Sequence, residues 1–320
     1  MTGILDSLRH TAKTQARRIL LPEHYDERVI AAATALAERQ LAVPVLIDLP
    51  DEINEAPAGV EVFRQRSDAA EWTNKAIAAF TEARAAKGMT AEKATEQLKN
   101  PVLLAAVLLK LGFADGGVAG STATTADVLR AGIQGLGLAQ GAKQVSSFFL
   151  MELTDGRVLT YGDCGVIPDP DSAALAEIAV ASAASHQRLT GEEAKVAMLS
   201  FSTKGSAEHP RVDKVRAALD LAKQAAPALA IDGELQFDAA FVPAIGEKKA
   251  PGSAVAGHAN VFIFPDLDSG NIGYKITQRI GGAKALGPLL QGLAKPWMDL
   301  SRGCSAEDIV DVAVIAGVLG

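Results

Sequence analysis

The 320-residue chain has few of the residues that mark a disulfide scaffold or a metal site. It contains two cysteines, Cys164 and Cys304, and five histidines. Two cysteines are too few for a disulfide framework or a cysteine-rich zinc site, although the sequence alone leaves a single disulfide open. The histidines show no metal-ligand or catalytic-triad spacing, and we expect His186 and His209 to face solvent.

Long apolar runs and a targeting segment are also lacking. No run approaches the roughly 18–20 apolar residues needed to span a bilayer. Residues 1–18 are polar and mildly basic, without the apolar region of a signal peptide. Together with the low cysteine content, these features predict a cytoplasmic protein with no membrane partner.

The charge balance argues against nucleic acid as a partner. The formal net charge is −7, the sequence pI is about 5.4, and both signs are mixed along the chain. An acidic chain of this kind is a poor candidate for generic nucleic-acid binding. Any anionic ligand would need a local cluster of basic side chains on an acidic body.

Short apolar runs alternate with longer amphipathic stretches, as strands alternate with helices. The predicted strands are 19–21, 43–47, 114–119, 144–153, 157–161, 196–200, 229–235 and 260–264. The predicted helices are 26–40, 67–86, 90–99, 102–111, 171–187, 211–225 and 305–318. This alternation predicts an α/β fold with mainly parallel sheets flanked by helices.

A chain of this length favours two domains. Boundary candidates lie near residues 143–147, after a glycine-rich segment, and near Pro296. One layout joins residues 1–145 to residues 299–320 as domain I and makes residues 146–298 domain II. Periodicity alone does not give this layout.

The segment before the last predicted helix carries the most chemistry. It offers the hydroxyl of Ser301, the guanidinium of Arg302 and the carboxylate of Asp308 around a helix N-terminus. A helix N-terminus favours anions, and the arginine fork suits phosphate oxygens. Ser305 and Asp308 also have the spacing of an N-terminal cap, an interpretation that is compatible with catalysis.

Four further segments carry weaker signals. After the strand 114–119, small residues and hydroxyls, with Ser121 and Thr124 among them, could cradle a phosphate, or the glycines could form a tight turn. Lys204 follows another strand end, where an anion site and a capped loop are equally compatible. Arg84 lies on a helix face that is usually just solvated. Cys164 could be a nucleophile, but a small buried thiol is the favoured interpretation.

Taken together, these segments resemble the phosphate acetyltransferase/phosphate butyryltransferase family, and its acetyl branch specifically. The resemblance covers nearly the whole chain. It is strongest over 113–130, 162–179, 200–215 and 255–308, and the last of these contains Asp-Leu-Ser-Arg-Gly at 299–303. So many matches in the same order are more specific than any single motif.

The resemblance implies two α/β domains with an active site in the cleft between them, and a homodimer. It implies that Ser301, Arg302 and Asp308 are catalytic and that Arg84 and Arg130 bind phosphate or substrate. It also implies that Cys164 lies near the site without being the nucleophile. The substrates implied are coenzyme A (CoA) or acetyl-CoA, acetyl phosphate and inorganic phosphate, with no metal and no prosthetic group.

Some positions depart from the pattern of the family. Ala131 stands where proline is common, and Ile167 where asparagine is common. Trp297 and Met298 replace the usual Val-Asn just before Asp299. The last change is close to the catalytic segment, and it leaves the range of acyl chains open.

The expected mechanism is direct attack by the CoA thiolate on acetyl phosphate. A thiol with a pKa of about 8.5 needs a base, for which Asp308 is the candidate. Burial would have to raise the basicity of Asp308 from an ordinary pKa of about 3.9, while Arg302 and the helix N-terminus act in the opposite direction. Ser301 would donate to the developing oxyanion, and Arg302 with Arg84 and Arg130 would hold the phosphate.

Three alternatives stay open at this point. The same chemistry could act on a butyryl or propanoyl group. A metal- and NAD-dependent decarboxylating dehydrogenase could share the two-domain architecture, although Asp163 and Asp169 alone make no convincing metal cluster. A non-catalytic CoA-binding relative should have lost the Ser-Arg…Asp segment, which is present here.

Overall fold

The computed structural model describes residues 3–320, which divide into two compact units. The first unit holds residues 5–141 and 293–320, and the second holds residues 142–292 with the start of the chain. The boundaries between the two units therefore fall after residues 141 and 292. The layout proposed from the sequence placed them after residues 145 and 298. The second boundary lies earlier because β11 (Trp297–Asp299) pairs with a strand of the first unit.

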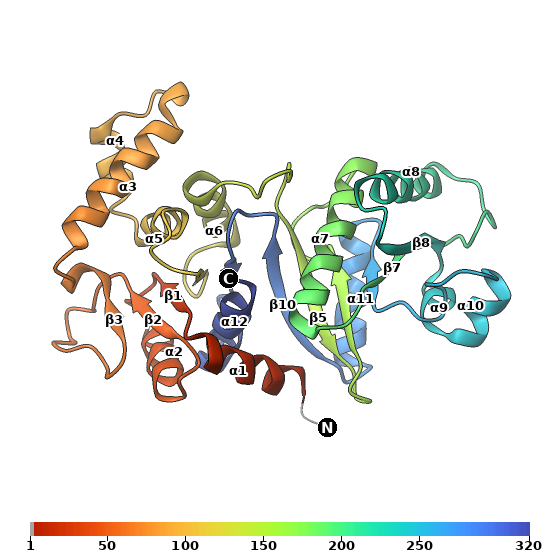
Figure 1. The fold of residues 1–320 in the computed structure, drawn as a ribbon, viewed down its shortest axis with the longest axis horizontal. Coiled ribbons are helices and arrows are strands. Elements are labelled where there is room, and N and C mark those ends of the chain that lie inside the picture. Colours follow the sequence, from red (N-terminus) through yellow and green to blue (C-terminus); the bar gives the residue numbers. More distant parts are fainter. Residues whose placement is uncertain (1–2) are drawn as a thin grey trace. The chain divides into compact units, whose positions relative to one another are not determined.

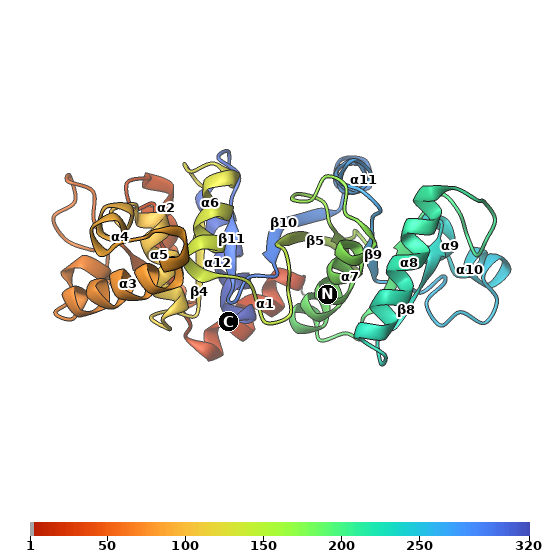
Figure 2. The same cartoon turned by 90° about the horizontal axis from the view of Figure 1, so that it is seen from above.

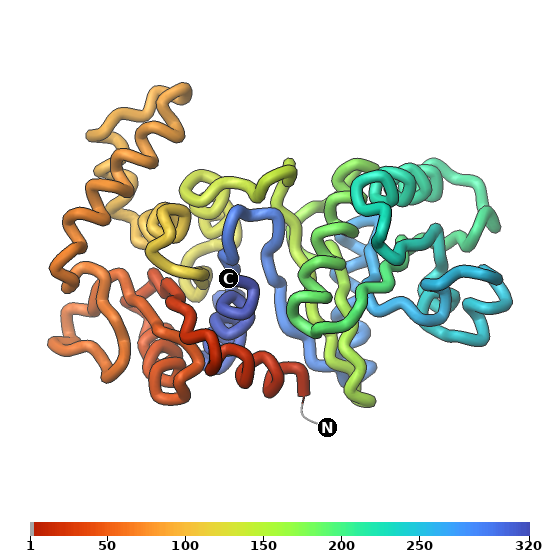
Figure 3. Tube along the Cα trace, viewed as in Figure 1, coloured from red at the N-terminus to blue at the C-terminus, as the bar shows by residue number. Residues whose placement is uncertain are grey.

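The first unit is built on a wholly parallel sheet of five strands in the order β11-β4-β1-β2-β3. Its other strands are β1 (Arg18–Leu21), β2 (Val43–Leu46), β3 (Glu61–Val62) and β4 (Gly116–Ala119). The blue C-terminal segment returns among the red to yellow-green segments of this unit (Figure 3), because β11 closes one edge of the sheet.

Helices cover this sheet on both faces. The helices of the first unit are α1 (Ile4–Gln15), α2 (Glu27–Glu38), α3 (Ala69–Ala83), α4 (Ala91–Gln97), α5 (Pro101–Lys110), α6 (Thr125–Ala131) and α12 (Ala306–Leu319). Short turns of helix lie at η1 (Phe63–Gln65), η2 (Ala85–Lys87) and η3 (Gly132–Leu136). Neighbouring positions of β4 show the two faces: a Cβ on Gly116 would meet Ala316 of α12, and one on Gly117 would lie near Leu109 of α5.

The second unit has a mixed six-stranded sheet in the order β10-β5-β6-β9-β7-β8. Its strands are β5 (Ser146–Glu152), β6 (Val158–Gly162), β7 (Lys195–Leu199), β8 (Ala230–Leu235), β9 (Val261–Ile263) and β10 (Lys284–Gln291). β6, β9, β7 and β8 run parallel, and β5 is antiparallel to both of its neighbours. The prediction of mainly parallel sheets is thus confirmed.

The helices of the second unit form two layers (Figures 1 and 2). They are α7 (Ser172–Thr190), α8 (Pro210–Ala225), α9 (Phe237–Phe241), α10 (Pro243–Lys249) and α11 (Leu267–Arg279). α7 and α8 pack side by side on one face through Leu175, Ile178 and Val215. The opposite face packs its aromatic residues, including Tyr161 and Phe262, toward α9 and α11.

The structure corrects one prediction about a side chain. His186 does not face solvent: it is fully buried on α7, and its Nδ1 lies 2.9 Å from the Thr160 hydroxyl. Burial lowers its pKa to about 4. His186 lies on the face of α7 that packs against the sheet. Because alanines occur all around this helix, its buried face could not be recognised from the sequence. None of the helices described over residues 3–320 has the length and apolar character to cross a membrane.

Candidate active site

The loop after β4 is an anion cradle, and its anion is a side chain of the protein. Glu23, in the loop after β1, is 1% exposed and accepts six hydrogen bonds from residues 120–123. Four come from successive backbone N–H groups and two from the hydroxyls of Ser121 and Thr122. Such a run of N–H groups forms a concavity suited to negative charge. The phosphate cradle considered from the sequence is therefore filled by Glu23.

The electrostatics of Glu23 follow from these donors. Burial by itself raises the pKa of a carboxyl group, but hydrogen bonds from Ala123, Thr122 and Ser121 outweigh it and lower the pKa of Glu23. The carboxylate stays ionised and fixes the loop. Ser121 is 1% exposed, so its hydroxyl serves the loop and does not face solvent.

Thr124 and Arg130 lie on α6, directly after this cradle. Thr124 is the N-cap residue of α6 and accepts a hydrogen bond from the N–H of Asp127. Arg130 is paired with Asp127, and its side chain remains largely exposed. Arg130, Asp127 and Tyr25 line a cavity of about 190 Å³ between the starts of α5 and α6. Arg130 is the cation that this cavity offers to an anionic group.

The segment after β11 presents Ser301 and Arg302 on the surface. Both residues are exposed, and the Ser301 hydroxyl accepts a hydrogen bond of 3.3 Å from the N–H of Gly303. The main chain of this segment is held more firmly than its side chains, because Leu300 N–H donates to Ala119 O at 2.8 Å. Exposed side chains on a fixed main chain are available to a ligand.

Asp308 forms the capping box that its spacing predicts. Its Oδ2 accepts hydrogen bonds from the N–H and the hydroxyl of Ser305, and Ser305 Oγ accepts from the N–H of Asp308. The cap interpretation is thus confirmed. Asp308 is exposed, so the burial that its assignment as a base called for is not found.

The buried carboxyl group of this segment is Asp299 instead. It ends β11, is 3% exposed, and its Oδ1 has no hydrogen-bond partner within residues 3–320. Burial raises the pKa of Asp299 to about 6, against an opposing hydrogen bond from Thr125, and the nearby charge of Glu23 adds to the rise. Two buried carboxyl groups therefore lie next to Gly120. The pKa of Glu23 is lowered, whereas that of Asp299 is raised to about 6.

One guanidinium joins the cradle to the segment after β11. Arg28, in the first turn of α2, donates to the carbonyls of Ser121, Arg302 and Cys304. Of the residues singled out in the sequence, the structure thus brings together Ser121, Arg302 and, through the start of α12, Asp308. Glu23 and Asp299 lie in stretches that carry the family resemblance, but neither they nor Arg28 were singled out, because each reads in the sequence as an ordinary charged residue near a helix start or a strand end.

Arg84 lies at the C-cap of α3, with its guanidinium 5.6 Å from the centre of the Phe80 ring. Its Nε is buried and has no hydrogen-bond partner among the described residues.

Lys204 and Cys164 belong to the second unit. The Lys204 ammonium pairs with Asp232 and donates to Gly233 O, so it would have to leave that pair to bind a substrate anion. Cys164 is fully buried, and burial, together with the nearby Asp163, raises the pKa of its thiol well above the usual range. A buried protonated thiol is a poor nucleophile. Cys164 and Cys304 are both free thiols.

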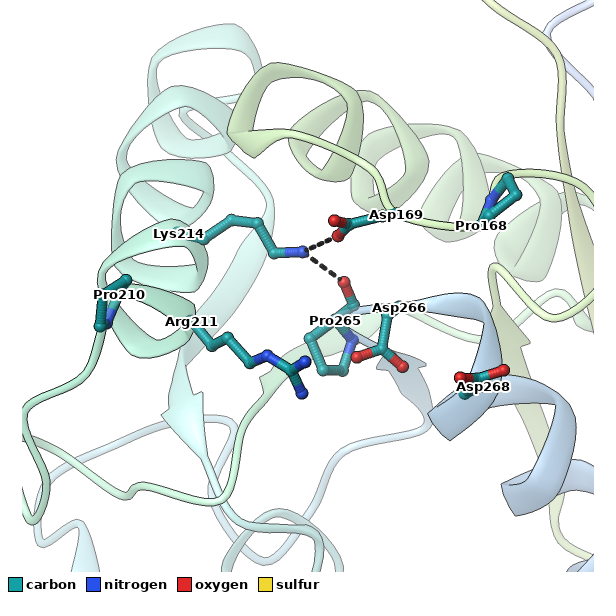
Figure 4. Close-up of a pocket in the computed structure, with 8 residues that line it drawn as sticks. All are labelled: Pro168, Asp169, Pro210, Arg211, Lys214, Pro265, Asp266 and Asp268. Carbon is teal, nitrogen blue, oxygen red and sulfur yellow. Dashed lines mark hydrogen bonds and ion pairs between the residues drawn. The ribbon is translucent and has the colours of Figure 1, made fainter.

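A cavity of about 340 Å³ opens at the carboxyl ends of β6 and β9 (Figure 4). Lys214 lines it but is held by Asp169 and by Pro265 O, whereas the Arg211 guanidinium points into the opening. Asp169 is thereby used in an ion pair, and Asp163 accepts hydrogen bonds from Ser147 and the loop 165–167. Residues 3–320 contain no group of three or more His, Cys, Asp or Glu placed to share a metal ion.

Comparisons with known proteins agree with this architecture. The Phosphate acetyl/butaryl transferase family model matches residues 3–317. Phosphate acetyltransferases from Thermoanaerobacterium thermosaccharolyticum and Acetivibrio thermocellus are each 46% identical over 324 residues, covering 99% of this chain and 99% and 98% of theirs. The solved EutD phosphotransacetylase from Staphylococcus aureus matches with a TM-score of 0.89 at 42% identity, covering 98% of this chain and 97% of its own.

Proposed function

The chain belongs to the phosphate acetyl/butyryl transferase family, and from that premise we propose that it transfers acetyl reversibly between acetyl phosphate and coenzyme A. The observation that carries the proposal is the exposed Ser301-Arg302 pair, held on a fixed main chain beside the start of α12. The relatives named phosphate acetyltransferase, aligned over nearly their whole length, support the choice of acetyl.

In the proposed reaction, acetyl phosphate and CoA are bound together, and the CoA sulfur attacks the acetyl carbonyl directly. The S–C bond forms, the C–O bond to phosphate breaks, and inorganic phosphate leaves. Arg302 and Arg130 hold the phosphate group and stabilise the charge that it gains on leaving. Ser301 donates to the carbonyl oxygen as it becomes negative, an interaction typically worth about 3–4 kcal/mol.

The acceptor for the thiol proton is Asp308 in this proposal. Because Asp308 is exposed, burial does not raise its basicity, and the assignment rests on its place just after Ser301 and Arg302, at the start of α12. Both of its hydrogen bonds from Ser305 reach Oδ2, and Oδ1 is the atom assigned to the thiol. Orientation of the two substrates supplies much of the remaining acceleration. The reaction needs no metal and no prosthetic group, because acetyl phosphate is already activated.

The test is acetyl-CoA formation from acetyl phosphate and CoA by purified, metal-stripped protein. We expect rapid turnover by the wild type and a loss of about 100-fold or more in Arg302→Ala. Arg64→Ala, which removes an exposed arginine paired with Asp48, is the control and should keep wild-type activity. Wild-type protein that turns over neither acetyl, propanoyl nor butyryl phosphate would contradict the reaction class.

A paired comparison separates the two roles of Asp308. Asp308→Asn removes the proton acceptor and weakens the cap, whereas Ser305→Ala removes the cap partner and leaves the carboxylate. If Asp308 is the base, its variant should lose about 100-fold more activity than Ser305→Ala. Equal and modest losses in the two variants would mean that the carboxylate acts only as a cap.

We further propose that the protein works as a cytoplasmic homodimer. Free thiols at Cys164 and Cys304 suit a reducing compartment. Ile272, Ile276 and Ile280 are 57%, 52% and 83% exposed at four-residue spacing along α11 and its C-cap. An apolar stripe of this kind is typical of a covered helix face. Ile276→Asp should lower the mass measured by light scattering to that of one chain, and an unchanged mass would place the interface elsewhere.

A further inference from the structure

The side chain of Arg28 donates hydrogen bonds to three main-chain carbonyls in the loops of the first unit. Its Nη1 donates to the carbonyls of Arg302 and Cys304 at 2.9 and 2.8 Å, and its Nη2 donates to Ser121 O at 2.8 Å. The guanidinium therefore touches the loops that follow β4 and β11 while its own backbone begins α2, after β1. These three strands are neighbours in the sheet, so one side chain joins three adjacent loops at the carboxyl edge.

The guanidinium is itself held in one orientation. Asp26, the N-cap residue of α2, accepts from Arg28 Nε at 3.1 Å and from Nη2 at 2.7 Å. A two-point contact between a planar guanidinium and a carboxylate fixes the plane of both groups. Asp26 is buried, and the hydrogen bonds from Arg28 outweigh the effect of burial and keep its pKa below the usual range.

The two carbonyls in the segment after β11 lie on either side of Gly303. Ser301, Arg302 and Gly303 are all exposed, so little side-chain packing holds them. Glycine also gives the main chain more freedom than any other residue. The Leu300 N–H is bonded to Ala119 O on one side, and the Cys304 N–H closes a turn on Ser301 O at 2.9 Å on the other. The hydrogen bonds from Arg28 to the carbonyls of residues 302 and 304 anchor that turn to α2 and to the loop after β4.

We propose that Arg28 is a positioning residue of the acyl transfer reaction, setting the main chain so that Ser301 and Arg302 meet the substrate in the reactive orientation. This inference rests on the proposed roles of Ser301 and Arg302. Arg28 does not itself touch the reacting atoms in this account. Its contribution is geometric, and a misplacement of about 1 Å in a catalytic group can cost on the order of 100-fold in rate.

The test compares Arg28→Ala and Arg28→Lys with a matched variant, Arg66→Ala. Arg66 forms the same kind of two-point contact with an aspartate two residues away, Asp68, at 2.8 and 3.0 Å, but it binds no carbonyl of the segment after β11. We expect kcat to fall about 100-fold in Arg28→Ala, with smaller changes in KM, and to stay near the wild-type value in Arg66→Ala. Arg28→Lys should recover little activity, because one ammonium cannot replace a planar fork with five donors.

Millimolar guanidinium ion should restore part of the kcat of Arg28→Ala, and potassium chloride at equal ionic strength should not. Wild type and Arg28→Ala are both assayed at a temperature at which circular dichroism shows them folded, where a role in stability alone predicts no loss of kcat to be rescued. Arg28→Ala within threefold of wild type, or a loss equal to that of Arg66→Ala, would overturn the inference. Arg302→Ala is measured in parallel: if it keeps full activity, the assignment of the catalytic segment fails, whereas an inactive Arg302→Ala beside an active Arg28→Ala refutes only the role of Arg28.

Discussion

Glu23→Gln is the substitution whose effect can be worked most directly from the structure. Glu23 Oε2 accepts from the N–H groups of Gly120 and Ser121, and Oε1 accepts from those of Thr122 and Ala123. A glutamine keeps one acceptor oxygen and places an NH₂ group at the other position. In one orientation the NH₂ group faces the buried N–H groups of Gly120 and Ser121. In the other it faces those of Thr122 and Ala123, whose hydrogen bonds are only partly buried, and the cost then lies toward the low end for two unsatisfied donors.

The expected cost follows from that count. An unsatisfied buried donor costs about 1–3 kcal/mol, so two should lower the free energy of unfolding by about 2–6 kcal/mol. The hydroxyls of Ser121 and Thr122 limit the loss, because each can turn and accept. Against a typical total of about 5–15 kcal/mol, a loss of this size is a large fraction of the stability of the unit.

The assay is urea denaturation followed by tryptophan fluorescence. Both tryptophans of the chain, Trp72 and Trp297, lie in the first unit, so the signal reports on the unit that contains Glu23. Glu27→Gln is the control, because Glu27 is exposed in the first turn of α2 and should change stability by less than about 0.5 kcal/mol.

The pH dependence supplies a second check. The pKa of Glu23 is lowered in the folded protein, so its contribution is complete above the pKa of the unfolded chain and is lost as the pH falls through the folded pKa. The difference in the free energy of unfolding between wild type and Glu23→Gln should therefore become smaller at acidic pH. A gap below about 1 kcal/mol at neutral pH, or one that does not change with pH, would refute the reasoning from unsatisfied donors.

Three further predictions concern buried titrating groups and one glycine. The pKa of Asp299 is raised from 3.8 to about 6, so wild-type stability should fall by up to about 3 kcal/mol as the pH rises from about 4 to 6, and Asp299→Asn should remove that slope from the tryptophan signal. The pKa of His186 is lowered to about 4, so circular dichroism should show the second unit losing up to about 3 kcal/mol as the pH falls from about 6.5 to 4, a loss absent from His186→Gln. Gly120 has a φ of +108°, and an added Cβ would lie 2.6 Å from Asp299 Oδ1 and 2.7 Å from Leu300 N. Gly120→Ala should therefore unfold at a lower temperature and lose activity. An unchanged melting temperature and turnover would show that the loop can shift to accept the methyl group.

The alternation of strands and helices could be predicted because most elements carry a clear apolar period. The helix expected over 171–187 is α7, and the strand expected over 43–47 is β2. α11 was missed because its polar sequence contains Gly270 and Gly273. A Cβ on Gly270 would lie 2.3 Å from Asp163 O, and one on Gly273 would lie 2.9 Å from the Phe264 ring. Glycine there serves close packing, a tertiary requirement that local propensity does not contain.

Trp297 stands just before the candidate catalytic segment, where the family usually has valine. Its packing explains how the larger side chain fits there. Trp297 is fully buried, donates through Nε1 to Val128 O at 3.1 Å, and lies where a Cβ on Gly117 or Gly132 would meet its ring at 2.6 or 2.9 Å. The large ring is accommodated by two glycines in the core of the first unit. This departure from the family pattern is therefore explained by core packing.

The candidate site contains side chains proposed to carry the chemistry and side chains that hold the loops in place, and only the first group could be proposed from the sequence. A serine, an arginine and an aspartate around a helix start suggest anion chemistry from their types alone. Glu23 and Arg28 act through partners about 100 and 274 residues away in the chain, and neither has a local pattern that names those partners. Parallel strands produce such contacts, because each strand end comes from a distant part of the chain and all of them meet at one edge. The residues that position a site of this kind must therefore be read from the fold, whereas candidate catalytic residues can be proposed from the sequence.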